Sequence, residues 1–137
     1  MIVLDCSIAI AWCFADEATP ALDALLDLVQ ADGAIVPPLW TLEVTNVLTQ
    51  AARRGRLAPE AVRTRLGLLD MLPITQDDGG AGRVWRDNLL VLARGTNLTT
   101  YDATYLELAI RRGFSLATSD TALRVAATGR GVAVLPG

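Results

Sequence analysis

The sequence contains no histidine and no lysine, so all 12 of its basic residues are arginine. These absences exclude Ser-His-Asp and Cys-His nucleophilic catalysis, histidine-ligated zinc, and phosphate-binding loops that depend on a lysine. There are only two cysteines, Cys6 and Cys13, and their spacing fits neither a disulfide framework nor a zinc motif. We interpret them as buried thiols. The chemistry that remains available is that of carboxylates.

Long apolar segments are also missing, since no run approaches the roughly 20 residues needed to span a bilayer. The N-terminal segment meets Asp5 at once and lacks the basic start of a signal peptide. We therefore expect a cytoplasmic protein without a membrane segment. The formal net charge of −3 argues against positive potential over the whole surface, although a basic rim around an acidic site would not show in that total.

The chain has 137 residues, of which 52% are hydrophobic and 20% charged, a composition typical of one well-packed domain covering residues 1–137. Short apolar segments alternate with longer helical patterns. This alternation predicts the α/β class, with a central parallel sheet of about five short strands and helices on both faces. The predicted strands lie at 2–4, 34–36, 73–75, 115–118 and 132–134, and the predicted helices follow Ser7 and lie at about 19–31, 39–51, 59–71, up to 94, 101–112 and 121–128.

Four acidic residues lie where the pattern predicts core or sheet edge. Asp5 and Asp120 follow predicted strands, and Asp102 opens a predicted helix with Thr99 as its expected cap. Ligands of open parallel sheets bind at the carboxyl ends of the strands, so these three acids can share one rim. Each also has an ordinary interpretation, as a strand-end acid that binds loop amides or as a helix-start acid that complements the helix dipole.

Glu43 is less ordinary, because Leu39 and Val47 lie one turn before and after it and place it on or beside a face that should be buried. Asn46 shares that face and is positioned to orient it. The simpler alternative is a boundary glutamate that reaches solvent. Together the four acids predict an oxygen-ligand site for Mg²⁺, with Mn²⁺ as a possible substitute.

Four segments in this order, IVLDCSIAIAW, PPLWTLEVTNVL, LTTYDATYLELA and LATSDTAL, resemble the PIN domain in its VapC-type toxin branch. The resemblance implies a metal-dependent endoribonuclease that hydrolyses RNA phosphodiesters with metal-activated water and leaves a 3′-hydroxyl and a 5′-phosphate. It implies Asp5, Glu43, Asp102 and Asp120 as the catalytic and metal-binding quartet, with Asp5 and Asp102 as the most direct ligands. It further implies support from Ser7, Asn46 and Thr118.

Contacts with RNA are expected from arginines, the densest set being Arg53, Arg54 and Arg56, with Arg83 and Arg86 forming another. The alternative is that these are solvated helix ends. The three tryptophans either stack on bases or, as we favour, pack in the core or an interface; they are Trp12, Trp40 and Trp85.

The resemblance also implies a homodimer and a cognate antitoxin that silences the enzyme. Two other functions stay open. One is a non-catalytic module that binds RNA or a protein partner through an acidic metal pocket, and the other is a PIN nuclease of RNA processing.

Overall fold

The computed structural model describes all 137 residues and contains five strands, seven α-helices and one short 3₁₀ helix, η1. In chain order the elements are β1 (Ile2–Leu4), α1 (Cys6–Trp12), η1 (Ala15–Glu17), α2 (Pro20–Asp32), β2 (Ala34–Val36), α3 (Leu39–Arg53), α4 (Pro59–Asp70), β3 (Ile74–Gln76), α5 (Gly82–Arg94), α6 (Thr100–Arg112), β4 (Leu116–Ala117), α7 (Thr121–Gly129) and β5 (Val134–Leu135).

All strands join one parallel sheet in the order β3-β2-β1-β4-β5. Val3 in the central strand pairs with Ile35 of β2 on one side and with Leu116 of β4 on the other. The chain therefore adds β2 and β3 on one side of β1, then crosses back and adds β4 and β5 on the other side. The carboxyl ends of β1 and β4 form the switch point at which such sheets bind ligands.

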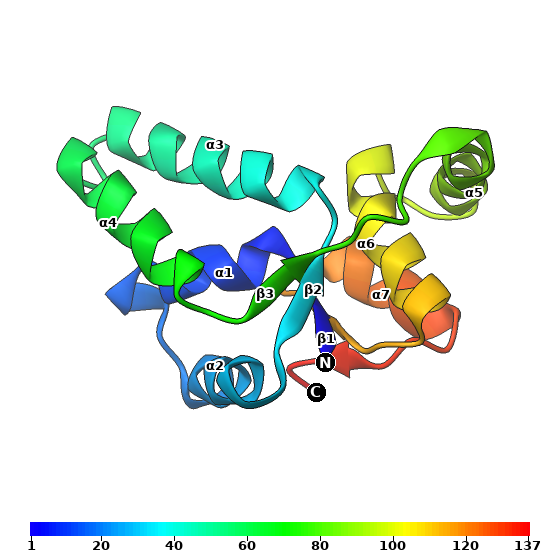
Figure 1. Cartoon of the computed structure of the whole chain (residues 1–137), viewed down its shortest axis with the longest axis horizontal. Helices are drawn as coiled ribbons and strands as arrows, with labels where there is room; N and C mark the ends of the chain where they lie inside the picture. The colour runs from blue at the N-terminus through cyan, green and yellow to red at the C-terminus, as the bar shows by residue number, and fades with distance from the viewer.

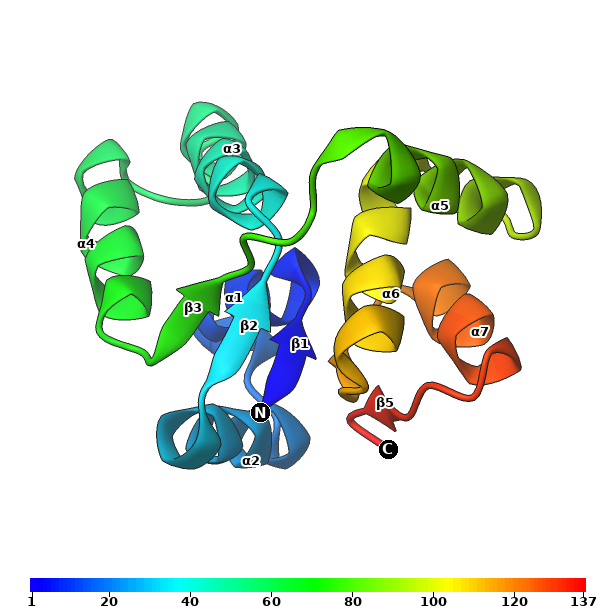
Figure 2. The same cartoon turned by 45° about the vertical axis from the view of Figure 1, so that its right-hand side comes forward.

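Helices cover the sheet on both sides, which confirms the predicted α/β class with its central parallel sheet. Figures 1 and 2 show α1 to α4 on one side and α5 to α7 on the other. Within these groups α1 packs against α3 and α3 against α4, while α6 packs against β1 and β4. None of the helices combines the length and hydropathy that crossing a bilayer requires.

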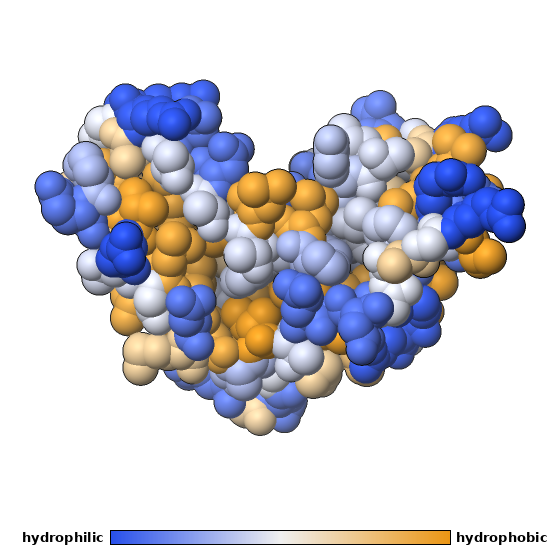
Figure 3. Space-filling view, turned by 45° about the horizontal axis from the view of Figure 1, so that its top comes forward, coloured by the Kyte–Doolittle hydropathy of each residue, from blue (hydrophilic) through white to orange (hydrophobic).

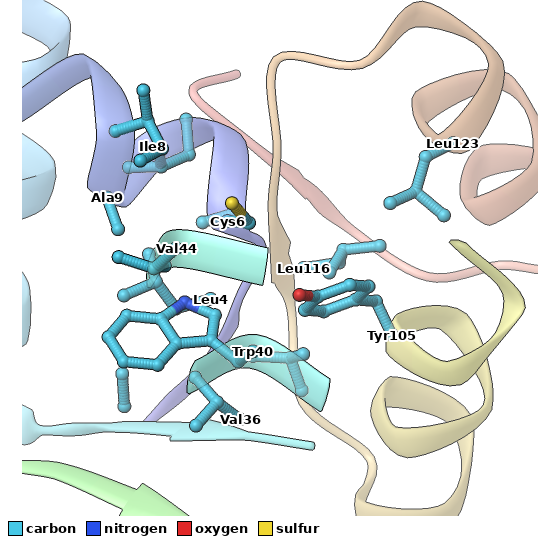
Figure 4. Close-up of a cluster of buried hydrophobic side chains, with 14 of the residues drawn as sticks. Leu4, Cys6, Ile8, Ala9, Val36, Trp40, Val44, Tyr105, Leu116 and Leu123 are labelled. Atoms are coloured by element: carbon cyan, nitrogen blue, oxygen red, sulfur yellow. The ribbon is translucent and has the colours of Figure 1, made fainter. Parts of the chain in front are cut away.

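The core is centred on the strands and on α6. Every residue of β1 and β2 is buried, as expected for strands covered on both faces. In α6 all residues from 103 to 109 are buried, so this helix lies inside the molecule. Figure 4 shows Tyr105 of α6 beside Leu116 of β4, facing the elements that carry Cys6 and Val44.

The helix predicted at 39–51 forms, but its buried face is narrower than the apolar pattern indicated. Trp40, Val44, Leu48 and Ala51 are buried, whereas Leu42 is 68% exposed. Val47 is also exposed. The reason is that α3 packs on α1 and α4 through one stripe, which leaves the flanking apolar side chains in solvent.

The last strand lies at Val134–Leu135 and not at 132–134 as predicted, because its register is set by pairing of Val134 with Leu116. The other strand predictions hold to within one residue at each end. The space-filling view in Figure 3 shows a notch between two arms, which correspond to α3 with α4 and to α5 with α6 in Figure 1. In Figure 2 the carboxyl ends of β1 and β2 point toward this region between α3 and α6.

Candidate metal centre

Asp5 is the acidic residue at the switch point. Its backbone N–H donates to the Ala117 carbonyl oxygen at 2.9 Å, which continues the pairing of β1 with β4 beyond the end of the strand. The side chain is buried, and its Oδ2 accepts hydrogen bonds from Ser7 Oγ at 2.6 Å and from Thr118 Oγ1 at 2.7 Å. Ser7 lies in the first turn of α1 and Thr118 follows β4, so hydroxyls from both sides of the switch point hold one carboxylate oxygen and leave Oδ1 without a hydroxyl donor.

Burial raises the pKa of the Asp5 carboxyl above its usual value, and the charge of Asp102 raises that pKa further. The hydroxyls of Ser7 and Thr118 lower the pKa, but they offset only part of the effect of burial. Ionised Asp5 is therefore a charge that its surroundings compensate incompletely. A cation bound beside it would supply the missing compensation.

Glu43 reaches the same region from α3. Its Oε1 accepts a hydrogen bond from the hydroxyl of Tyr105 on α6, and its Oε2 accepts none. Burial raises the pKa of Glu43, the Tyr105 hydrogen bond lowers it, and the charges of Asp5 and Asp102 raise it again. Asp5, Glu43 and Asp102 thus lie close enough to repel one another.

Asp102 lies in the first turn of α6. Its backbone N–H donates to Thr99 Oγ1 at 3.1 Å, which confirms the predicted cap. The Asp102 side chain is half-buried and makes no hydrogen bond, so both of its carboxylate oxygens are available.

Asp120 is placed differently from the other three acids. Its Oδ1 accepts the backbone N–H of Leu123 at 2.8 Å and so caps the start of α7. Its own N–H donates to Thr118 Oγ1 at 3.1 Å, the same hydroxyl that binds Asp5. The Asp120 charge is not among those that raise the pKa of Asp5 or Glu43. Asp120 is therefore linked to Asp5 through the Thr118 hydroxyl, while its Oδ1 caps helix α7.

The donor chemistry of the centre fits a hard divalent cation. Glu43 Oε2, Asp5 Oδ1 and the Asp102 carboxylate are oxygen atoms of the kind that Mg²⁺ and Mn²⁺ prefer as ligands. As they stand, no three His, Cys, Asp or Glu side chains are grouped closely enough to hold a metal ion. Joint coordination of one ion by these carboxylates would require their side chains to move closer together.

The residue that bonds to Glu43 is not the one that the sequence pattern indicated. Asn46 is exposed and makes no hydrogen bond with Glu43, whereas Tyr105 does. The sequence did contain a signal for Tyr105, because a tyrosine on an apolar helix one turn beyond Asp102 needs a buried partner for its hydroxyl.

The arginines at the end of α3 lie away from the carboxylates. Arg53 is ten residues beyond Glu43 on the same helix, which places it about 15 Å along the axis. Arg56 is engaged elsewhere, with Glu17 at 2.7 Å, Asp16 at 3.5 Å and the ring of Phe14 beneath its guanidinium. Arg53 and Arg54 are exposed and form no ion pair, so they remain the available cations of this set.

The tryptophans pack within the fold, as we favoured. Trp40 is buried, the indole N–H of Trp12 donates to the Leu22 carbonyl oxygen at 3.0 Å, and that of Trp85 donates to Glu107 Oε2 at 3.1 Å. Both cysteines are buried free thiols, as predicted, and burial with nearby carboxylates raises the pKa of Cys6 to about 12.

Comparison with known proteins places this geometry in a family. The model of the PIN domain matches residues 2–129, while no curated protein is significantly similar in sequence. Among solved structures, PAE2754 from Pyrobaculum aerophilum has a TM-score of 0.69 and 25% identity, covering 97% of this chain and 81% of that one.

FitAcB from Neisseria gonorrhoeae has a TM-score of 0.68 and 16% identity over 98% of this chain and 96% of its own. FitAB bound to an IR36 DNA fragment has a TM-score of 0.60 and 16% identity over 98% and 94%. At this identity the two Fit structures show the fold alone. Because the family model spans nearly the whole chain, the protein belongs to the PIN domain family, whose members are generally nucleases.

Proposed function

We propose that this protein is an endoribonuclease that depends on Mg²⁺ or Mn²⁺. The observation that supports the proposal is that the charges of Asp5, Glu43 and Asp102 lie near enough to act on one another beside the switch point of the sheet, while Asp5 and Glu43 each keep one carboxylate oxygen free of hydroxyl donors. With histidine absent, the site has no side chain that ordinarily titrates near neutral pH for metal-free acid-base cleavage.

In the proposed reaction Asp5 and Asp102 are the direct ligands, and Glu43 and Asp120 complete the site. When bound, the ion supplies the charge that activates water and stabilises the negative charge that develops on the phosphodiester. Ser7 and Thr118 fix the Asp5 carboxylate by binding Oδ2, so that Oδ1 is directed by the protein and not by solvent. In this proposal the exposed Arg53 and Arg54, at the carboxyl end of α3, contact RNA phosphates away from the cleaved bond.

We further propose that the enzyme is the toxin of a type II toxin-antitoxin pair, a homodimer that acts on cytoplasmic RNA and is silenced by a cognate antitoxin. The four sequence motifs that resemble the VapC-type branch support this proposal. The likeness in fold to FitAcB and FitAB is compatible with it. A PIN nuclease of RNA processing is the alternative within the same chemistry.

The test of the enzymatic proposal is cleavage of purified RNA by the wild type with Mg²⁺, with excess EDTA, and by Asp5→Asn and Asp102→Asn. We expect cleavage with Mg²⁺, none with EDTA, and a loss of at least about 100-fold in each variant. Asp70→Asn, at an exposed position ending α4, is the matched control and should cleave like the wild type.

Metal-dependent binding of RNA without any shortening would instead identify a non-catalytic binding module. Cleavage that persists in EDTA would overturn the metal mechanism. Mapping of cellular RNA 5′ ends after brief induction, with Asp5→Ala as the control, separates the toxin from an RNA-processing nuclease. Growth arrest with new 5′ ends supports the toxin. Defined processing of RNA without growth arrest supports the processing nuclease.

A further inference from the structure

The hydrogen bond between Tyr105 and Glu43 joins the two arms that border the notch, since Tyr105 belongs to α6 and Glu43 to α3. We propose that Tyr105 is a positioning residue that fixes Glu43 so that its free oxygen faces the metal centre. This inference rests on the proposed function, because it assigns a role to Tyr105 within the same site.

Tyr105 is suited to position another side chain because its own side chain is held in place by the surrounding core. Its side chain is fully buried, and α6 is buried on either side of it from residue 103 to residue 109. Figure 4 shows its ring beside Leu116 and its oxygen directed away from α6, toward the α1 and α3 side of the core. The hydroxyl makes one hydrogen bond, to Glu43.

Glu43 needs such a partner. It is only half-buried, its neighbours Leu42 and Asn46 on α3 are exposed, and no other side chain bonds to its carboxylate. A glutamate without a partner samples several rotamers, and ordering it at the moment of ion binding has an entropic cost. The Tyr105 hydroxyl removes that freedom before an ion arrives.

The two fixed carboxylates are held in the same way. Tyr105 binds Glu43 through Oε1 alone, as Ser7 and Thr118 bind Asp5 through Oδ2 alone. In each case one oxygen is anchored by hydroxyl donors and the other remains free for a cation. Groups that orient metal ligands in this manner commonly change metal affinity by about 10- to 100-fold when removed.

The experiment measures binding of Mn²⁺ alone, without RNA, from the electron paramagnetic resonance signal of the free ion. Tyr105→Phe removes only the hydroxyl, and we expect it to weaken Mn²⁺ binding by about 10-fold or more. Tyr101→Phe is the matched control, because Tyr101 lies one turn earlier on α6, is exposed, and makes no side-chain hydrogen bond; its affinity should equal that of the wild type.

A double-mutant cycle separates positioning from a general loss of packing. If Tyr105 acts through Glu43, then Tyr105→Phe in a Glu43→Gln background changes Mn²⁺ affinity by less than about 2-fold. An unchanged affinity in Tyr105→Phe alone, or an equal loss in both backgrounds, overturns the inference. If the wild type itself binds no Mn²⁺, the proposed metal site fails and the inference fails with it.

A measurement on the wild type covers the case in which Tyr105→Phe does not fold. The Tyr105 hydroxyl proton should give a slowly exchanging NMR signal, assigned by its shift in Glu43→Gln, and this signal should persist when Mg²⁺ is added. Its loss on addition of Mg²⁺ would mean that Glu43 leaves Tyr105 to bind the ion, which overturns the positioning role.

Discussion

Arg111, in the last turn of α6, binds the buried carboxylate of Asp77, which follows β3 at the edge of the sheet. Arg111 Nη2 lies 2.7 Å from Asp77 Oδ2, and Nη1 lies 3.2 Å from Oδ1. Arg111 Nε also donates to Glu107 Oε1 at 2.7 Å. Because α6 carries Asp102 and Tyr105, this ion pair fixes the helix that supplies two residues of the proposed centre.

Asp77→Asn is expected to destabilise the protein by about 1–2 kcal/mol, because the buried side chain at position 77 then loses its charge-assisted hydrogen bonds, while the partly exposed Arg111 keeps Glu107 as a partner. Urea unfolding at neutral pH measures the change. Asp78→Asn is the control, since Asp78 is the exposed neighbour and forms no ion pair. Equal stability of the two variants would show that the Arg111 contact contributes little.

The same pair predicts a pH dependence. The Arg111 hydrogen bonds hold the pKa of Asp77 below its usual value, so the folded state binds its proton less readily than the unfolded state. The stabilisation is fully present above the unfolded pKa of about 3.9 and is lost as the pH falls through the lower folded pKa. The difference in unfolding free energy between wild type and Asp77→Asn should stay constant from pH 7 to about 5 and shrink below about 4; a constant difference down to pH 3 contradicts the assignment.

Thr118→Val tests the hydroxyl that joins Asp5 to Asp120. The substitution keeps the side-chain shape but removes the bond to Asp5 Oδ2 and the acceptor of the Asp120 N–H. We expect a loss of about 1–3 kcal/mol in unfolding free energy and weaker Mn²⁺ binding, because Asp5 then keeps only its hydrogen bonds with Ser7. Thr118→Ser should retain both properties, and Thr64→Val, at an exposed position of α4, should be neutral.

Two substitutions of Asp120 separate its helix cap from its place in the site. Asparagine caps helices as well as aspartate, so Asp120→Asn should keep the unfolding free energy within about 0.5 kcal/mol, while Asp120→Ala should lower it by about 0.5–2 kcal/mol. We expect Asp120→Asn to reduce RNA cleavage less than Asp5→Asn does. An equal loss of cleavage would make Asp120 a metal ligand of the same rank as Asp5.

Removal of metal should show how much the ionised Asp5 carboxylate destabilises the folded protein. Because burial raises the pKa of Asp5, its ionisation destabilises the metal-free fold at neutral pH. Asp5→Asn, melted in EDTA, should therefore be at least as stable as the wild type. Addition of Mg²⁺ should raise the melting temperature of the wild type and not that of the variant. A lower melting temperature for Asp5→Asn in EDTA would show that the ionised carboxylate stabilises the fold.

Much of the fold was predictable because local patterns are strong in this chain. β-branched apolar segments between helical periodicities predicted four of the five strands to within one residue. Thr99 was predicted as the cap of α6 from its spacing to Asp102 alone. The exposure of Leu42 was not predictable, because the width of a buried stripe depends on which helices pack against it.

The candidate centre was only partly predictable for a related reason. Strand ends and helix starts are local features, so Asp5, Asp102 and Asp120 could be assigned to one rim from the sequence. Asp120 was assigned to a strand end from the sequence, and only the structure shows that its Oδ1 caps α7. The partner of Glu43 lies 62 residues away, and no local pattern specifies such a contact.

The sequence by itself determined the class of fold, the acidic character of the site, and the exclusion of histidine and lysine chemistry, because these follow from composition and short-range periodicity. Only the tertiary structure decided which carboxylate oxygens are anchored and which are free. Those properties arise where β1 meets β4 and where α3 meets α6, through hydroxyls whose partners are distant in the chain but adjacent in space.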